Sequence, residues 1–210
     1  ACPAAGRSPT SSPSRRCRPS RRSAGTGASH RPREWRPSPA GPQLIVWTPL
    51  HIQGLDPRSG KIHWSIPYEI TYGVSIATPI YHHDTVFITA YWAGSKAIRL
   101  GPQATDAKLL YEENRFLRGL MAQPLYRDGH VYTIDKQFGL TCFEFATGRK
   151  LWDDEHQMTP RGRNPQATLV WLGDGDRVII LNELGDLILA RLNLTGYHEQ
   201  SRTRIIERQE

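Results

Sequence analysis

The residues best suited to bind a metal ion are the consecutive Tyr81, His82, His83 and Asp84. Imidazole nitrogens and carboxylate oxygens are ordinary zinc ligands when they converge on one ion. Successive side chains of an extended strand point to opposite faces, so His82 and His83 are not expected to bind the same ion. Corresponding stretches later in the chain hold ordinary turn residues. We therefore predict a solvated turn here and no metal ligand.

Other candidate groups for chemistry are equally incomplete. Residues 173–176 read Gly-Asp-Gly-Asp, but the rest of an Asp-rich Ca²⁺ loop is missing, which favours a tight turn. The cysteines Cys2, Cys17 and Cys142 form no C-x-x-C pair, and Cys142 is expected to be a buried apolar residue. G-x-S-x-G, P-loop and H-E-x-x-H motifs are absent from the sequence. No catalytic, cofactor-binding or metal-binding residue is predicted.

Two similar turns suggest that the elements of this chain repeat. They read GLDPRSGKIHW, residues 54–64, and CFEFATGRKLW, residues 142–152. A glycine supplies the positive φ of a tight hairpin, the acidic and hydroxyl side chains can bond the turn backbone, and the tryptophan can cover a neighbouring sheet. The structural residues of the motif are Asp56, Ser59, Gly60 and Trp64 in the first turn and Glu144, Thr147, Gly148 and Trp152 in the second.

Short runs rich in Val, Ile and aromatic residues occupy the sequence around these turns, as in β-strands. Three such runs, 84–92, 129–135 and 176–182, each follow one short run and precede two more. Four strands in about 40 to 48 residues are typical of a propeller blade. The sequence therefore predicts an all-β fold, an incomplete β-propeller of about four four-stranded blades. We assign a partial blade to 42–76 and blades to 77–120, 121–165 and 166–207.

Residues 1–41 differ in composition, with nine Arg, eight Ser, seven Pro and one acidic residue, Glu34. Because they hold few apolar side chains, they are predicted to be disordered. Their net charge is +8, whereas residues 42–210 carry −1, so a basic nucleic-acid groove on the folded part is not expected. Three explanations stay open: a reading-frame artefact in GC-rich DNA, a functional basic tail, and an organelle transit peptide.

Both turns resemble the repeat of pyrroloquinoline-quinone-type (PQQ-like) β-propellers, roughly Ala-x-Asp-x-x-Thr-Gly-Lys-x-x-x-Trp. Asp56, Gly60, Lys61 and Trp64 match that pattern, with Ser59 in place of Thr. The second turn matches at Thr147, Gly148 and Trp152 and departs from it at Glu144 and Arg149. This resemblance covers residues 42 to about 207 and implies that the chain is a fragment, about half of a propeller of seven or eight blades.

The same resemblance implies two classes of function. One comprises quinone-dependent dehydrogenases, many of which have a disulfide between adjacent cysteines. The sequence has no adjacent cysteine pair, so no cofactor is predicted. The other comprises non-catalytic scaffolds, and we expect a scaffold for protein–protein interaction. The alternative is a fragment of a PQQ-dependent oxidoreductase whose cofactor site lies on missing blades. Whether the chain is an enzyme stays undecided, and the sequence leans against it.

Candidate contacts with a protein partner lie in the connections between blades. They are Arg161 and Arg163 in one polar connection and Phe116 in a more apolar one. Missing blades or a second chain would close the propeller, and bare blade faces predict dimerisation or aggregation. No stretch approaches the ~20 apolar residues of a membrane helix. The resemblance implies a periplasmic or exported bacterial protein, although no signal peptide is visible.

Overall fold

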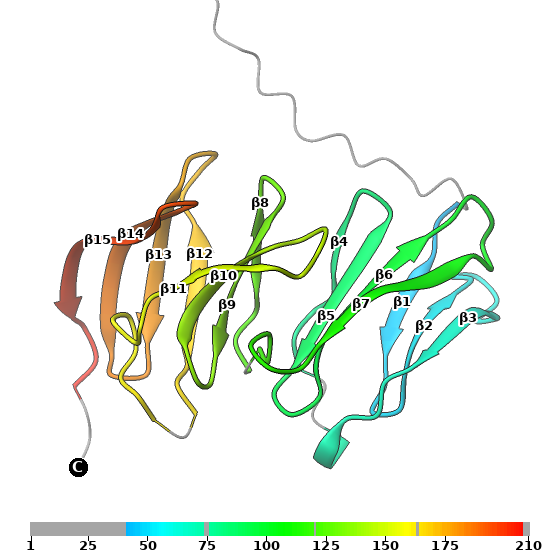
Figure 1. Ribbon diagram of the computed structural model, residues 1–210, viewed down its shortest axis with the longest axis horizontal. Helices are drawn as coiled ribbons and strands as arrows, with labels where there is room; N and C mark the ends of the chain where they lie inside the picture. The colour runs from blue at the N-terminus through cyan, green and yellow to red at the C-terminus, as the bar shows by residue number, and fades with distance from the viewer. Residues whose placement is uncertain (1–40, 74–75, 120, 163, 208–210) are drawn as a thin grey trace, which may run out of the picture. The chain divides into compact units, whose positions relative to one another are not determined.

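The computed structural model describes residues 41–73, 76–119, 121–162 and 164–207. These residues form antiparallel β-strands grouped into four sheets, which are called blades 1 to 4 in chain order (Figure 1). Blade 1 has three strands and each of the others has four. The predicted all-β fold of about four blade-like sheets is therefore confirmed. The segment predicted to be disordered, 1–41, lies outside the described residues except for Gly41.

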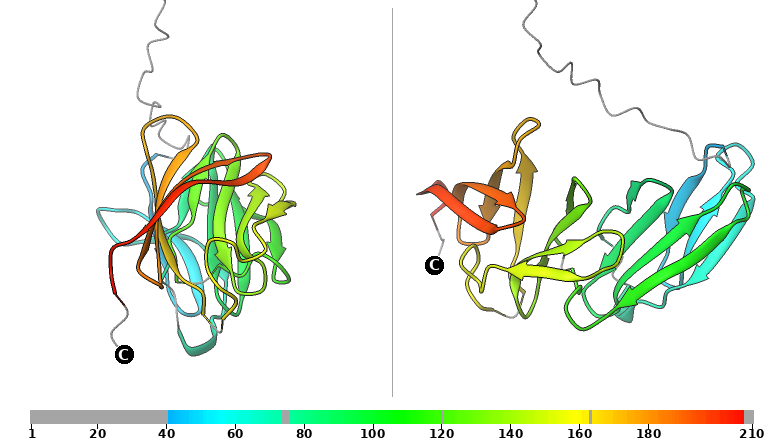
Figure 2. Two further views of the ribbon diagram at one scale, coloured as in Figure 1. Left: turned by 90° about the vertical axis from the view of Figure 1, so that its left-hand side faces the viewer. Right: turned by 45° about the horizontal axis from the view of Figure 1, so that its top comes forward.

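Each blade is built from strands that are consecutive in the chain, and each strand pairs with its sequence neighbours. The two views of Figure 2 show the same grouping from other directions. The strands are β1 (Leu44–Trp47), β2 (His51–Leu55) and β3 (Ile62–Pro67) in blade 1; β4 (Ile80–His82), β5 (Thr85–Ala90), β6 (Gly94–Leu100) and β7 (Ala107–Glu113) in blade 2; β8 (Leu125–Arg127), β9 (His130–Asp135), β10 (Gly139–Glu144) and β11 (Lys150–Asp153) in blade 3; β12 (Ala167–Trp171), β13 (Arg177–Asn182), β14 (Asp186–Asn193) and β15 (Gly196–Arg204) in blade 4.

A three-residue 3₁₀ turn, η1 (Thr71–Gly73), lies in the connection between blades 1 and 2. In the described part of the chain no helix has the length and hydrophobicity needed to cross a membrane.

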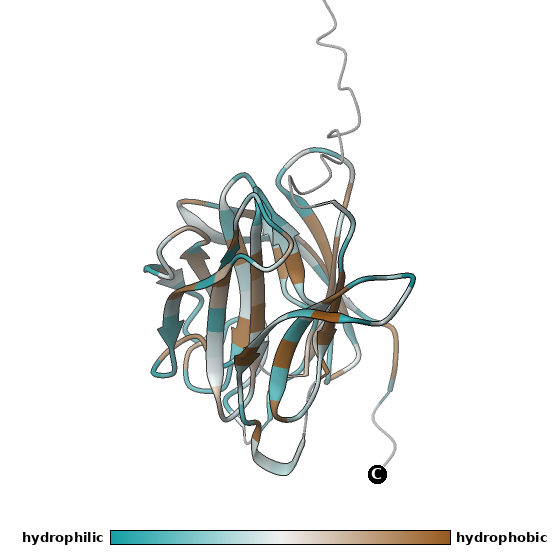
Figure 3. Ribbon diagram, turned by 90° about the vertical axis from the view of Figure 1, so that its right-hand side faces the viewer, coloured by the Kyte–Doolittle hydropathy of each residue, from teal (hydrophilic) through white to brown (hydrophobic). Residues whose placement is uncertain are grey.

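Alternation along each strand gives a blade two apolar faces. Val131 of β9 belongs to the core between blades 2 and 3, whereas its neighbour Tyr132 belongs to the core between blades 3 and 4. A third core joins blades 1 and 2 and includes Ile52 and Ile98. Figure 3 accordingly shows the hydrophobic residues mainly on the strands. The blades are therefore held together by side-chain packing between sheets.

Candidate functional site

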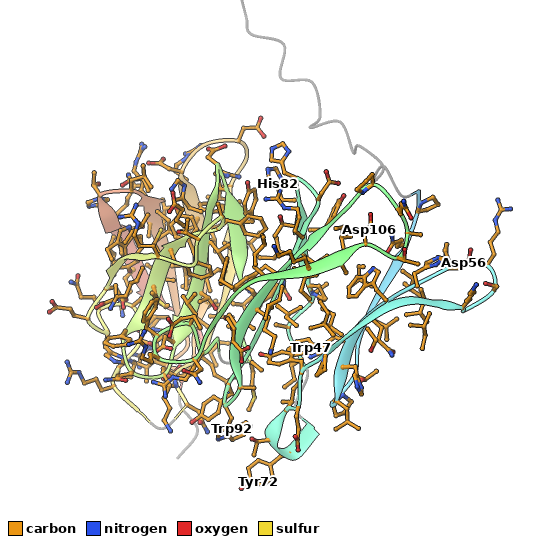
Figure 4. All side chains as sticks on the ribbon, turned by 45° about the vertical axis from the view of Figure 1, so that its right-hand side comes forward. Trp47, Asp56, Tyr72, His82, Trp92 and Asp106 are labelled. Carbon is orange, nitrogen blue, oxygen red and sulfur yellow. The ribbon has the colours of Figure 1, made fainter. Side chains whose placement is uncertain are left out.

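The connections between blades lie at one end of the sheets, together with the β1–β2 turn of blade 1 and the turn between the second and third strands of blades 2 to 4. This follows from the antiparallel order, because successive turns of an up-and-down sheet alternate between its two ends. We call this end the connector end; in blades 2 to 4 its strand turns are residues 91–93, 136–138 and 183–185. Figure 4 shows Tyr72 and Trp92 together at this end, while Asp56, His82 and Asp106 lie toward the other.

A row of aromatic side chains and one lysine, exposed except for the buried Tyr91, crosses the connector end. The ring of Tyr72 meets the ring of Trp92 edge to face, with 5.2 Å between centroids, and Trp92 contacts Tyr91 at 4.2 Å. Lys136 Nζ of blade 3 lies 5.1 Å from the Tyr91 ring. Tyr72 is 83% exposed and Trp92 is 42% exposed. This aromatic row, defined as Tyr72, Trp92, Tyr91 and Lys136, therefore extends from the connection before blade 2 to blade 3.

Tyr72 is held in this row by an unfavourable backbone conformation. Its φ is 60°, in the left-handed region that a bulky side chain rarely occupies. The preceding Ile70 is buried and Ile70 N donates to Pro49 O at 2.8 Å, which fixes the start of the turn. Backbone strain of this kind costs on the order of 1–3 kcal/mol and is concentrated at functional positions. The strained residue and the exposed ring thus coincide at one position.

Buried carboxylates also lie at the connector end. Asp135 accepts hydrogen bonds from Gln137 N at 2.7 Å, Phe138 N at 3.2 Å and Arg118 N at 3.1 Å. Burial raises the pKa of Asp135 above its ordinary value, and these amides oppose that rise. Its oxygens thus fix a turn of blade 3 and the connection that precedes this blade. We expect Asp135 to organise the backbone rather than to transfer protons.

Asp154 performs the same task after blade 3. It is buried and accepts from Leu140 N at 2.7 Å, Met158 N at 2.8 Å and His156 N at 3.1 Å. Burial raises its pKa as well. Three backbone donors occupy its oxygens, and these bonds bring the connection to blade 4 back against β10. Asp154 is therefore another organiser of backbone.

Asp186 of blade 4 is buried among charged partners. Its oxygens accept from Arg204 Nε at 2.6 Å and from Arg202 Nη1 at 3.2 Å. The hydrogen bond from Arg204 is the main reason that the pKa of Asp186 lies below its ordinary value. This carboxylate links the start of β14 to the end of β15.

The first sequence-predicted turn is a tight hairpin at the opposite end. Asp56 Oδ1 accepts from Ser59 N at 2.7 Å and Arg58 N at 2.8 Å, and these bonds lower the Asp56 pKa. Gly60 has φ of 71° and its N donates to Asp56 O at 2.9 Å. The indole of Trp64 is buried in the core between blades 1 and 2. The motif residues of this turn are thus occupied by the turn and the core.

The second predicted turn has similar geometry with different donors. Thr147 Oγ1 donates to Glu144 Oε2 at 2.6 Å, which is the main reason that the Glu144 pKa is lowered. Gly148 has φ of 73°, and its N donates to Glu144 O at 2.8 Å. A Cβ atom at Gly148 would overlap the ring of Tyr111 in blade 2. Gly148 is therefore required both by the turn and by the close approach of the neighbouring blade.

Aromatic residues of the outer strands connect each blade to the next. Trp152 Nε1 donates to Asn193 O of blade 4 at 2.9 Å, and Tyr111 Oη donates to Phe145 O of blade 3 at 2.9 Å. In blade 2, Tyr111 of the outer strand pairs with Ala97, and in blade 3, Trp152 of the outer strand pairs with Cys142. Tyr111 and Trp152 therefore occupy equivalent positions in their blades.

At the first joint, Gln43 relays the contact between the tryptophan and the next blade. Trp64 Nε1 donates to Gln43 Oε1 at 2.7 Å, and Gln43 Nε2 donates to Ala104 O of blade 2 at 3.4 Å. The tryptophan of each predicted turn is therefore placed at a joint between blades.

The predicted separation of His82 and His83 is wrong. Their ring centroids lie 3.9 Å apart, because His83, with φ of 43°, already belongs to the turn between β4 and β5. Tyr81 Oη donates to Asp84 Oδ1 at 2.9 Å within this turn. Within the described ranges, no group of three or more His, Cys, Asp or Glu side chains is arranged to hold a metal ion.

The other candidate groups also have structural partners. Asp176 of the Gly-Asp-Gly-Asp stretch accepts from Arg191 Nη1 at 2.9 Å and from Asn193 Nδ2 at 3.2 Å. Cys142 is a free, buried cysteine, and burial raises the pKa of its thiol to about 12. Such a thiol is not a nucleophile at neutral pH.

Two of the three sequence-predicted partner contacts, Phe116 and Arg161, lie in connections of the connector end. Phe116 is half-buried against the core of blades 2 and 3, which leaves only part of its ring for a partner. Arg161 is exposed in the connection before blade 4. Arg163 lies outside the described residues. Tyr72 and Trp92 were not predicted; the only sequence sign is the consecutive Tyr91 and Trp92 just before the turn glycine Gly94.

No family model matches the sequence, and no curated protein matches it. Solved structures do resemble the fold. One is BamB from Moraxella catarrhalis, with a TM-score of 0.53 and 18% identity over 78% of this chain. Another is the β-propeller domain of Cps50 (Swd1) from Myceliophteria thermophila, with a TM-score of 0.52 and 10% identity over 80% of this chain.

The chain spans about half the length of both proteins, namely 47% of the BamB chain and 56% of the Cps50 chain. At these identities the likeness concerns the fold alone. The sheets described above are therefore similar to the blades of β-propellers and correspond to part of such a propeller.

Proposed function

We propose that this chain is a non-catalytic β-propeller scaffold that binds a protein partner at its connector end. The observation that carries the proposal is the exposed aromatic row. Tyrosine and tryptophan combine a large apolar surface with few rotatable bonds, and they are enriched where proteins bind one another. Here they project from a strained turn and from a strand turn, and both lie on elements anchored by packed blades.

The chemistry of the other candidate groups supports a binding role. The buried carboxylates Asp135 and Asp154 accept hydrogen bonds from backbone amides of their own loops. A catalytic acid or base must instead reach a substrate proton. Lys136 at the end of the aromatic row adds one positive charge, which suits a partner with an acidic group beside an apolar one.

Site-specific photo-crosslinking in an extract of the producing cells tests this proposal. A photoreactive phenylalanine replaces Lys136 in one variant and Arg58, at the opposite end, in another. We expect one discrete cross-linked protein from position 136 and none from position 58. Adding Tyr72→Gly and Trp92→Ser to the variant with the photoreactive residue at position 136 should abolish its cross-link. Tyr72→Gly should not lower the stability of the protein, because glycine adopts the positive φ without strain.

The matched control is Ile62→Ser, which removes another exposed apolar side chain, half-exposed at the start of β3. It should leave the cross-link intact. An unchanged cross-link in the Tyr72→Gly, Trp92→Ser variant would refute binding at the aromatic row. Absence of any cross-linked species at position 136 would count against the scaffold function itself.

The alternative is a fragment of a PQQ-dependent oxidoreductase, and its support is the repeat resemblance at Asp56–Trp64 and Glu144–Trp152. Incubation with the quinone and Ca²⁺, followed by gel filtration, tests it. A red-shifted absorbance that travels with the protein would favour the oxidoreductase.

We also propose, from the same two turns, that the blades are of the PQQ-like type and that the protein acts in the periplasm or outside a bacterial cell. Fractionation of cells that make the protein would test this location.

A further inference from the structure

Blade 4 exposes a face that the preceding blades use to bind their neighbours. The strand register makes the comparison direct, since Val170 pairs with Ile179 as Leu125 pairs with Tyr132. Following the strand registers from this pair gives five equivalent positions in blade 3 and blade 4. They are Leu125, Tyr132, Ile134, Leu140 and Cys142 in blade 3 and Val170, Ile179, Leu181, Leu187 and Leu189 in blade 4.

The two sets differ in burial although both are apolar. In blade 3, Tyr132, Ile134, Leu140 and Cys142 are buried because blade 4 packs on them. In blade 4, Val170 is 55% exposed and the other four residues are only half-buried. We call these five residues of blade 4 the forward face. Five aliphatic residues with no charge among them are unusual on a solvated sheet face.

Blade 1 exposes the complementary side of such a joint. Leu44, Val46, Gln53 and Leu55 stand where Val131, Thr133, Thr141 and Phe143 stand in blade 3. Those residues of blade 3 are buried against blade 2, whereas Leu44 is 52% exposed and the other three are partly exposed. We call these four residues of blade 1 the rear face. It also carries no charged side chain.

We propose that the forward face of one copy packs against the rear face of a second copy, and that two such joints close a dimeric ring. The chain spans 47% and 56% of two solved propellers, so two copies supply about one complete propeller. A twofold axis makes both joints identical, and a ring that closes leaves neither face bare. This pairing is separate from partner binding at the aromatic row.

Existing joints show which residues meet. Leu125 of blade 3 is equivalent to Val170, and Val178 of blade 4 is equivalent to Leu44. Leu125 and Val178 both belong to the core between blades 3 and 4. Ile80 and Val131 occupy the same two positions in the core between blades 2 and 3. Val170 and Leu44 are therefore expected to come together at the joint between copies. In blade 4, Ser201 pairs with Leu189 at the position where Trp152 pairs with Cys142 in blade 3. The joint between copies therefore has no aromatic residue at this position and depends on the aliphatic side chains of the forward face.

Charge exchange at these two positions tests the ring in the full 210-residue chain. Sedimentation velocity should give the wild type twice the monomer mass of 23.8 kDa at tens of micromolar. Leu44→Glu alone and Val170→Lys alone should each raise the dissociation constant at least tenfold, because each charge meets an apolar partner at both joints. Mixing the two variants should restore the dimer, since one joint pairs Glu with Lys and the other is wild-type.

Leu194→Glu is the matched control, because Leu194 is 58% exposed in the β14–β15 turn and belongs to neither face. It should dimerise like the wild type. Far-UV circular dichroism of each variant verifies that the blades remain folded, and recovery of the dimer on mixing verifies it independently. A monomeric wild type, a dimer insensitive to both charges, or an open polymer would each overturn the proposal. A monomer would assign these faces to blades of another protein or of a longer chain.

Discussion

Replacing Trp64 is the most direct measure of how the joints between blades stabilise the fold. Trp64 is 6% exposed and lies in the core of blades 1 and 2, under Gly54. Burying ~200 Å² of indole at ~25 cal/mol per Å² stabilises by at most about 5 kcal/mol. Because a cavity would remain, we expect Trp64→Ala to lower the free energy of unfolding by about 3–5 kcal/mol.

A smaller change separates the hydrogen bond from the packing. Trp64→Phe keeps a ring in the core but removes the Nε1 donor that bonds Gln43 Oε1 at 2.7 Å. We expect it to cost about 1–2 kcal/mol, since one hydrogen bond and part of the ring are lost. Trp92→Ala, at the exposed aromatic row, should cost less than about 1 kcal/mol.

Urea unfolding followed by far-UV circular dichroism is the suitable assay, because these substitutions change tryptophan fluorescence directly. The slope of the free energy against urea should stay constant between variants, so that the midpoints report stability. If Trp64→Ala cost no more than Trp92→Ala, the buried joint would contribute little and the packing argument would be refuted.

Three further predictions concern single residues. Gly148→Ala should destabilise more than Gly60→Ala, as measured by urea midpoints, because both have positive φ but only Gly148 is packed against Tyr111. Asp186→Asn should lower the midpoint at pH 7, and the difference from wild type should shrink as pH falls below ~4, since a lowered folded-state pKa stabilises only above the unfolded value. Cys142 should resist a thiol reagent at pH 8 until urea unfolds the chain, once the other two cysteines are replaced by serine.

The fold could be predicted from the sequence because its determinants are local. Gly60 and Gly148 each sit in a turn defined by residues a few positions away, and their spacing reveals the blade period. The strand boundaries follow less directly from the sequence: the β-rich run 84–92 is longer than β5, which begins at Thr85 and ends at Ala90. Tyr91 and Trp92 lie in the three-residue turn that precedes β6, whose first residue, Gly94, has a positive φ.

The candidate site could not be predicted because it depends on contacts between distant residues. Tyr72 and Trp92 lie twenty positions apart, and neither belongs to a motif. The left-handed backbone of Tyr72 has no local sign, since such a conformation is expected of glycine or asparagine. His83 shows the same limit, because its positive φ brought two imidazoles together where an extended strand would have separated them.

The pairing of strands only with their sequence neighbours has a consequence for how such a chain changes in evolution. No named strand pairs with a strand of another blade in the described part of the chain. A recombination event within a connection can therefore delete or duplicate a whole blade and leave every remaining ladder of backbone hydrogen bonds intact. Length can change in steps of one blade, about 40 to 48 residues, and selection then acts only on how well the newly adjacent faces fit.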